Sequence, residues 1–244
     1  MDQLRTSHVQ TWLNAQTQWN STTKHDAITA LQRAFNWCVT NCGLDKNPIK
    51  GMEKPKAIAR KSTITQEEFD KLLEEIPDQL FRDLLIFSFD TGARPQEVKA
   101  LEARHVDIGQ ELILIPTDEA KGKKRPRVIY IPTTRSVEIL KRLTEQYPEG
   151  FLFRNRRGNQ WTATAVKDRF DDLDHVLGRR VTHYDFRRTW ITQSLLAGVD
   201  SHIVAQLAGH VDTSMIDKHY SQVADNHKFM KEMAKKGVNP CEDA

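Results

Sequence analysis

The chain has 244 residues, of which 39% are hydrophobic and 28% are charged, proportions typical of a globular protein that folds in water. No apolar run is long enough to span a bilayer and the first residues show no signal-peptide pattern, so we expect a cytoplasmic protein without membrane contact. The three cysteines lack paired spacing, which argues against a disulfide framework or a zinc site.

The net charge of +3 conceals a strong segregation along the chain. Residues 121–160 carry a net charge of +8 and residues 1–60 of +4, whereas residues 61–120 carry −8. Basic blocks of this size suit a partner with a phosphate backbone, although they are also common on solvated protein faces. Because the block at 121–160 lies between the arginine and histidine motifs of the chain, we expect a nucleic-acid partner.

Two amphipathic helices are predicted first, at about 7–15 and 24–42. The second carries apolar residues at spacings of three and four, so that one stripe should face a core. A stretch rich in proline and lysine follows, and we expect residues 49–62 to form a basic linker between a helical module, 1–48, and a larger domain, 63–244. The candidate DNA contacts in the linker are Lys50, Lys54, Lys56 and Lys61.

The larger domain opens with a capping box, in which Thr65 is followed three residues later by Glu68. A helix is expected through residues 80–91. The β-branched segments 111–115 and 127–131 predict a hairpin with a long basic tip. Further helices are predicted at about 133–146, 162–176, 184–197, 201–207, 212–219 and 224–235. The predicted fold class is therefore mostly α with a small antiparallel β-sheet.

Three short motifs carry the candidate chemistry: TGARPQEVKAL at 91–101, DFRRT at 185–189, and LAGH at 207–210 followed by Tyr220. Taken singly, such residues are usually a surface arginine, a helix cap and a half-buried aromatic. Together they are what attack on a phosphodiester requires. Arg94 and Arg187 can hold the non-bridging oxygens in paired hydrogen bonds, and Tyr220 supplies an oxygen nucleophile.

These motifs resemble the three conserved boxes of the tyrosine recombinase (phage integrase) family. The resemblance covers about residues 62–222 and extends more weakly over 7–50. It implies a tyrosine recombinase catalytic domain behind a small helical module, part of the family's core DNA-binding module, where the family usually has four or more helices and only two are predicted. The catalytic residues that it implies are Arg94, Arg187, His210 and Tyr220, with Glu97 as an acidic support.

The basic tip of the predicted hairpin, KGKKRPR at 121–127, contains the candidate general acid. By resemblance, Lys121 matches the family's catalytic lysine and would protonate the leaving 5′ oxygen, with Lys123 as the second choice. We expect Lys123, Lys124 and Arg125 to contact DNA. The alternative for each of these residues is a solvated basic loop.

The second box departs from the family pattern. Tyr184 stands three residues before Arg187, where a histidine or lysine is usual, and His183 lies one step earlier, about 100° away around a helix. A phenol with a pKa near 10 is a poor base at neutral pH. We therefore expect Tyr184 to contact the phosphate, with the proton-accepting role weakened or moved, and His183 to be a supporting residue.

The interpretation that follows is a site-specific DNA recombinase or integrase of a mobile element. It would cleave and rejoin DNA strands through a covalent 3′-phosphotyrosyl intermediate, without ATP or any other cofactor, and without metal because the arginines neutralise the phosphate. The expected partner is double-stranded DNA, with a homotetramer on DNA, a monomer in its absence, and association with the nucleoid when bound. Two alternatives stay open: a DNA-binding protein of the same fold with weak catalysis, and relaxation of DNA like a type IB topoisomerase.

Overall fold

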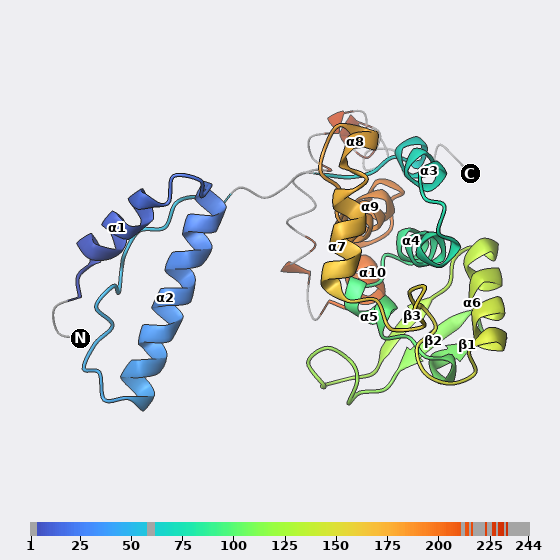
Figure 1. Ribbon diagram of the computed structural model, residues 1–244, viewed down its shortest axis with the longest axis horizontal. Coiled ribbons are helices and arrows are strands. Elements are labelled where there is room, and N and C mark those ends of the chain that lie inside the picture. Colours follow the sequence, from blue (N-terminus) through green and yellow to red (C-terminus); the bar gives the residue numbers. More distant parts are fainter. Residues whose placement is uncertain are drawn as a thin grey trace. The chain divides into compact units, whose positions relative to one another are not determined.

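The computed structural model describes residues 4–57 and 62–210, and beyond them residues 213, 214, 216, 223, 226, 227, 229–231 and 233. The chain divides into two compact units, Met1–Arg60 and Lys61–Ala244. The described residues form helices and one three-stranded antiparallel sheet, so the predicted fold class is confirmed (Figure 1). Among these residues, no helix combines the length and the apolar character that a bilayer crossing requires.

The first unit contains two helices, α1 (Thr6–Ala15) and α2 (Ser21–Asn41). Helix α2 begins three residues earlier than predicted, because the Asn20 side chain accepts a hydrogen bond from the Thr23 backbone N–H and caps the helix there. A small core joins the helices and the segment after α2; its buried members are Val9, Leu13, Ile28 and Ile49. The predicted apolar stripe of α2 is only partly buried, since Val39 near its end is exposed.

The helices of the second unit surround one central helix, α4 (Gln79–Thr91), most of whose residues are buried. Helix α4 packs against α9 (His183–Leu196) and α6 (Thr134–Gln146), as Figure 1 shows. The other helices of this unit are α3 (Gln66–Glu74), α5 (Pro95–Lys99), α7 (Ala163–Asp171), α8 (Asp174–Leu177) and α10 (Ser201–Ala208). The predicted capping box of Thr65 and Glu68 is present at the start of α3.

The sheet has the order β1 (Val106–Asp107), β2 (Leu112–Ile115) and β3 (Arg127–Tyr130), preceded by a short 3₁₀ helix, η1 (Ala103–His105). Strands β2 and β3 form the predicted hairpin and pair Ile113 with Ile129 and Ile115 with Arg127. Side chains alternate between the two faces of a strand, so Arg127 shares the buried face with Ile129, whereas Tyr130 is exposed. The register thus buries an arginine.

Two differences from the predicted elements concern short or interrupted segments. The helix predicted at 162–176 is two helices, α7 and α8, because the chain breaks at buried Leu173 and α8 ends at Gly178 in the left-handed conformation. Helix α5 and strand β1 were not predicted; they have five and two residues. The helices predicted at 212–219 and 224–235 lie outside the described residues, apart from single positions.

The start of the second unit is fastened to α9, the helix that carries the second motif. The hydroxyl of Ser62 donates to Asp185 Oδ1 at 2.6 Å, and the backbone N–H of Ile64 donates to Thr189 Oγ1 at 2.8 Å. Asp185 also accepts from the Thr182 backbone N–H at 2.8 Å, which completes a capping box at the first turn of α9. These bonds fix the helix that positions Arg187.

Candidate active site

Arg94 lies where the end of α4 turns into α5. Helix α4 stops at Gly92 in the left-handed conformation, and Pro95 begins α5 immediately after Arg94. The Arg94 guanidinium donates from Nη1 to Glu97 Oε1 at 2.5 Å and from Nη2 to the Gly209 carbonyl at 2.5 Å. The Glu97 carboxylate also accepts from the Arg94 backbone N–H at 3.0 Å. Glu97 therefore orients Arg94 from both its backbone and its side chain.

Arg187 is a buried arginine with no carboxylate bonded to it among the described residues. It is 1% exposed, and it donates from Nη1 to the Gly92 carbonyl at 2.8 Å and from Nη2 to the Ala208 carbonyl at 2.5 Å. Both acceptors lie at C-terminal ends of helices, α4 and α10, where the helix dipole is negative. Burial, followed by the charge of Arg94, lowers the pKa of Arg187 to about 10, so the guanidinium stays protonated at neutral pH.

His210 is placed by the way in which α10 ends. Gly209 is left-handed, and the backbone N–H of His210 donates to the Ala205 carbonyl at 2.8 Å, as in a Schellman motif. This turn sets His210 Nε2 at 2.9 Å from Arg187 Nη2. A guanidinium has only donors, so Nε2 must accept, and the ring proton is assigned to Nδ1. His210 is therefore a neutral ring with its donor at Nδ1.

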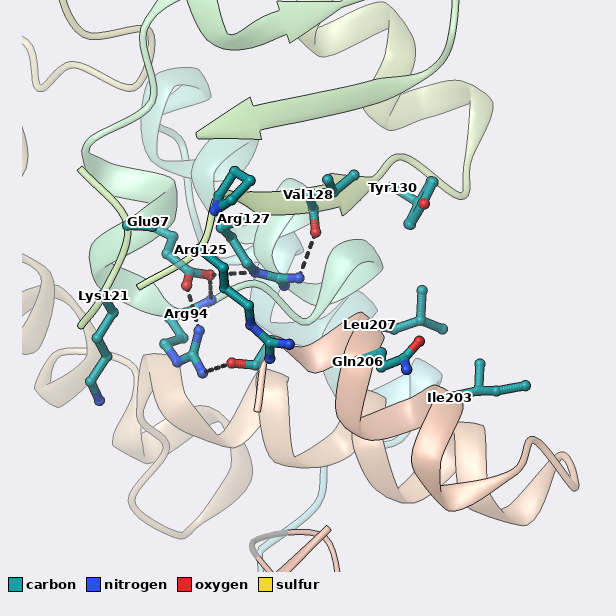
Figure 2. Close-up of a pocket in the computed structure, with 13 residues that line it drawn as sticks. Arg94, Glu97, Lys121, Arg125, Arg127, Val128, Tyr130, Ile203, Gln206 and Leu207 are labelled. Carbon is teal, nitrogen blue, oxygen red and sulfur yellow. Dashed lines mark hydrogen bonds and ion pairs between the residues drawn. The ribbon is translucent and has the colours of Figure 1, made fainter. Parts of the chain in front are cut away.

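A pocket of about 320 Å³ adjoins these residues and carries an excess of positive charge (Figure 2). Its charged lining consists of Arg94, Glu97, Lys121, Arg125 and Arg127. Burial alone would raise the pKa of Glu97, but the charges of Arg127 and Arg94 outweigh it and lower that pKa, so Glu97 stays ionised. Four cations against one anion make this pocket suited to an anionic ligand.

Arg127 is the site residue that sequence reasoning missed. The sequence places it at the start of a strand, and nothing in its basic surroundings distinguishes it from the exposed residues of the tip. One feature of the sequence could have indicated its burial: side chains alternate between the two faces of β3, so Arg127 lies on the same face as Ile129.

Some basic residues of the hairpin tip line the pocket, and the others face solvent. Lys121 is exposed and lies at the edge of the pocket, to one side of the arginines in Figure 2. Arg125 also lines the pocket and donates from Nη2 to the His210 carbonyl at 2.6 Å. Lys123 and Lys124 are exposed. In the first unit Lys50, Lys54 and Lys56 are exposed as well, and Lys61 lies outside the described residues.

The two candidates of the second box occupy different environments. His183 is buried, and its Nε2 lies 2.7 Å from Ser88 Oγ. Ser88 already donates to the Leu84 carbonyl, so His183 donates to Ser88. Burial, and then the charge of Lys99, lowers the pKa of His183 to about 3. Tyr184 is 50% exposed and stands three residues before Arg187 on α9, so the two side chains lie on neighbouring turns of the helix.

The structure thus brings together Arg94, Arg187 and His210, with Glu97 between Arg94 and Arg127. Tyr220, the candidate nucleophile, lies outside the described residues. Within the part of the chain that the structure describes, no group of three or more histidine, cysteine or acidic side chains could hold a metal ion.

Residues 62–227 match the phage integrase family, and the chain belongs to that family. The tyrosine recombinase XerA of Pyrococcus furiosus is 30% identical over 185 residues, covering 73% of this chain and 63% of the relative. The tyrosine recombinase XerC of Escherichia coli is 26% identical over 200 residues, covering 77% of this chain and 65% of the relative. The chain therefore spans less than two thirds of the length of these relatives.

Solved structures of integrases share the fold. The integrase of the transposon Tn1549, in complex with transposon right end DNA, has a TM-score of 0.76 at 18% identity and covers 99% of this chain and 87% of its own. A lambda integrase dimer bound to a COC′ core site has a TM-score of 0.71 at 15% identity, covering 90% and 80%. At these identities the likeness concerns the fold alone.

Proposed function

We propose that this protein is a site-specific DNA recombinase that cleaves and rejoins DNA strands through a 3′-phosphotyrosyl bond at Tyr220. The observation that carries the proposal is the convergence of Arg94, Arg187 and His210 from three distant segments, next to a pocket of excess positive charge that Arg94 lines. Family membership, relatives named tyrosine recombinases and fold neighbours solved on DNA support the same assignment.

The proposed chemistry divides the work among these side chains. Arg94 and Arg187 bind the non-bridging oxygens and stabilise the charge that develops at phosphorus. His210 donates from Nδ1, and Tyr184, at the surface beside Arg187, contacts the same phosphate.

The covalent step exchanges one ester for another. The Tyr220 hydroxyl gives its proton to solvent as its oxygen bonds to the 3′ phosphorus; the bond to the 5′ oxygen breaks, and Lys121 gives that oxygen a proton. The phosphotyrosyl bond keeps the energy of the broken linkage, so rejoining needs no ATP. In this scheme the arginines take the charge-neutralising role that a metal ion plays in other phosphoryl transfers.

Nicked candidate sites test the reaction, since the cleaved strand fragment diffuses away and traps the intermediate. We expect a denaturant-resistant protein–DNA adduct in the presence of EDTA and without ATP, and about 10²–10³-fold slower adduct formation by Arg94→Ala. Binding to these sites without an adduct favours the second candidate, a DNA-binding protein with weak catalysis. Relaxation of plasmids without sequence preference favours a topoisomerase-like activity.

The role of Lys121 has its own chemical test. A 5′-bridging phosphorothiolate has a leaving sulfur that needs no proton, so it should restore cleavage by Lys121→Ala. The phosphorothiolate substrate should give no comparable gain in cleavage by Lys123→Ala, because that variant keeps Lys121, the proposed acid. An absence of rescue for Lys121→Ala, or a rescue confined to Lys123→Ala, contradicts the assignment.

The wider DNA contacts and the assembly are also proposals. The helical module at 1–48 and the basic linker at 49–62 would bind DNA together with the catalytic domain at 63–244. The active assembly would be a homotetramer on two duplexes. In the absence of DNA we expect a monomer. Light scattering that showed a stable tetramer without DNA would contradict this.

A further inference from the structure

Arg127 is buried beside the proposed catalytic residues, yet none of the three motifs includes it. It is 7% exposed and donates from Nη1 to the Val128 carbonyl at 2.5 Å. Its Nε lies 3.6 Å from Glu97 Oε2, and its Nε and Nη2 atoms make no hydrogen bond to other described residues. Burial lowers the pKa of Arg127, with Glu97 acting in the opposite direction. Such a charge is costly to bury and calls for a function.

The guanidinium of Arg127 lies directly against the turn that positions His210. A Cβ atom added at Gly209 would meet Arg127 Nε at 2.7 Å and Cδ at 2.9 Å, so only a glycine fits here. The carbonyl of this glycine accepts from Arg94. Arg127 therefore contacts both the carboxylate and the backbone turn that hold Arg94, as Figure 2 shows for the Arg94–Glu97–Arg127 cluster.

We infer that Arg127 is a positioning residue of the proposed recombinase: it supports the Gly209–His210 turn and shares Glu97 with Arg94. The inference rests on the proposed function. Without Arg127, the Glu97 carboxylate would interact with Arg94 only and would neutralise more of its charge. The Gly209–His210 turn would also lose the Arg127 side chain against which it packs. With Arg127 in place, one carboxylate is divided between two guanidiniums, and Arg94 keeps a positive charge for the phosphate. The Nε and Nη2 atoms of Arg127 are buried, so the residue acts through its neighbours.

The electrostatic part of this role has a definite sign. Three cations interact with Glu97: Arg94 at the N-cap of α5, Arg127 on β3 and Arg187 on α9. Burial raises the pKa of Glu97; the charge of Arg127 is the largest single cause that lowers it, and Arg94 lowers it through its charge and its hydrogen bonds. Replacing Arg127 by glutamine should therefore raise the pKa of Glu97, whereas lysine keeps the charge and should largely preserve it.

Single-turnover cleavage of nicked DNA at several pH values tests the inference. We expect Arg127→Gln to slow cleavage on the order of 10²-fold, because small displacements of a catalytic group cost that much. The acidic limb of its rate profile should move to higher pH, and Arg127→Lys should bring the limb back. The salt dependence of DNA binding should match that of the native protein, since a buried arginine releases no counterions, whereas exposed Arg125→Gln should flatten it.

Gly209→Ala tests the same contact from the other side, with Gly198→Ala as a matched control. Both glycines follow a helix with a positive φ, +70° and +84°, but a Cβ at Gly198 would meet nothing within 4 Å. Gly209→Ala should slow cleavage far more than Gly198→Ala. Equal effects would show that backbone strain alone is responsible and would overturn the role of the Arg127 contact.

A titration of Glu97 by carboxyl ¹³C NMR keeps this inference separate from the proposed function. If the native protein forms no adduct on any site, the recombinase proposal fails, and the NMR titration still decides whether Arg127 controls Glu97. A Glu97 that titrates at higher pH in Arg127→Gln than in the native protein and Arg127→Lys supports the inference. Identical titration in all three proteins, or equal slowing of cleavage by the glutamine and lysine variants with unchanged pH profiles, overturns it.

Discussion

At Arg187, helix ends replace the carboxylate that usually accompanies a buried charge. The carbonyls of Gly92 and Ala208 accept its hydrogen bonds, and a side chain without donors would leave both buried acceptors unsatisfied. We expect Arg187→Met to lower the free energy of unfolding by about 1–3 kcal/mol for each acceptor. Arg94→Met should cost less, because Arg94 is more exposed. Urea denaturation of both variants measures this, and an equal loss would contradict the account.

His183 predicts a specific sensitivity to acid. Its pKa is lowered from 6.5 to about 3, so between these values the unfolded chain binds a proton that the folded protein does not. Its contribution to stability is therefore complete above pH 6.5 and is lost as the pH falls from 6.5 towards 3, by up to about 1.4 kcal/mol per pH unit. His183→Gln keeps a donor for Ser88 and should flatten this loss in denaturant titrations. An unchanged slope would show that His183 is not the group responsible.

Variants of Tyr184 and His183 distinguish a catalytic from a structural role in the second box. Cleavage by Tyr184→Phe should fall, because the lost hydroxyl belongs to an exposed side chain one helical turn from Arg187. His183→Gln should cleave at close to the native rate wherever it is folded, because His183 is buried and bonded to Ser88. A healthy Tyr184→Phe beside an inactive, folded His183→Gln would reverse the assignment.

Motifs predicted Arg94, Arg187 and His210 as a group, and the structure places them together. The motifs could not predict Arg127. Its burial depends on the pairing of β3 with β2, in which Arg127 lies opposite Ile115, and therefore on contacts distant in sequence. Nor could the sequence show that His183 is buried, since one step around a helix decides between the core and the surface.

Among the elements, the left-handed end of α4 is the one on which the site depends most directly. Gly92 (φ 60°, ψ 15°) and Gly178 (φ 62°, ψ 16°) end α4 and α8 with nearly identical backbones. An added Cβ would meet Trp190 at 2.6 Å at Gly92 and nothing within 4 Å at Gly178. Both alanine variants bear about 1–2 kcal/mol of strain.

Gly92→Ala should therefore be destabilised by a further 1–3 kcal/mol or so from overpacking. It should also cleave more slowly than Gly178→Ala, because the Gly92 carbonyl holds Arg187. Thermal or urea unfolding with adduct assays measures both effects. Equal stability of the two variants would mean that Trp190 moves aside freely.

Element prediction succeeded where periodicity was long and failed where tertiary contacts decide. Helix α6 and the β2–β3 hairpin follow patterns of apolar residues and match the predicted positions closely. Helix α5 is too short for a periodic pattern, and it is stabilised by the bonds between Glu97 and Arg94. The break between α7 and α8 has no proline or glycine to mark it.

For the whole molecule, the segregated charge predicts how DNA affinity depends on salt. Each cation that neutralises a phosphate adds about 0.9 to the magnitude of the slope of log K against log salt. Replacing Lys50, Lys54 and Lys56 by glutamine should lower that magnitude by up to about 3, whereas arginine at the same positions should preserve it. Fluorescence anisotropy at several salt concentrations measures the slope. A slope unaffected by the glutamine variant would mean that these lysines lie away from DNA.

The most direct measurement of the central claim is mass mapping of the DNA-linked peptide after incubation with nicked sites. We predict that proteolysis yields one modified peptide, joined through the phenol oxygen of Tyr220 to a 3′ phosphate, and that Tyr220→Phe yields none. A linkage at another residue, or a Tyr220→Phe protein that still forms the adduct, would contradict the account.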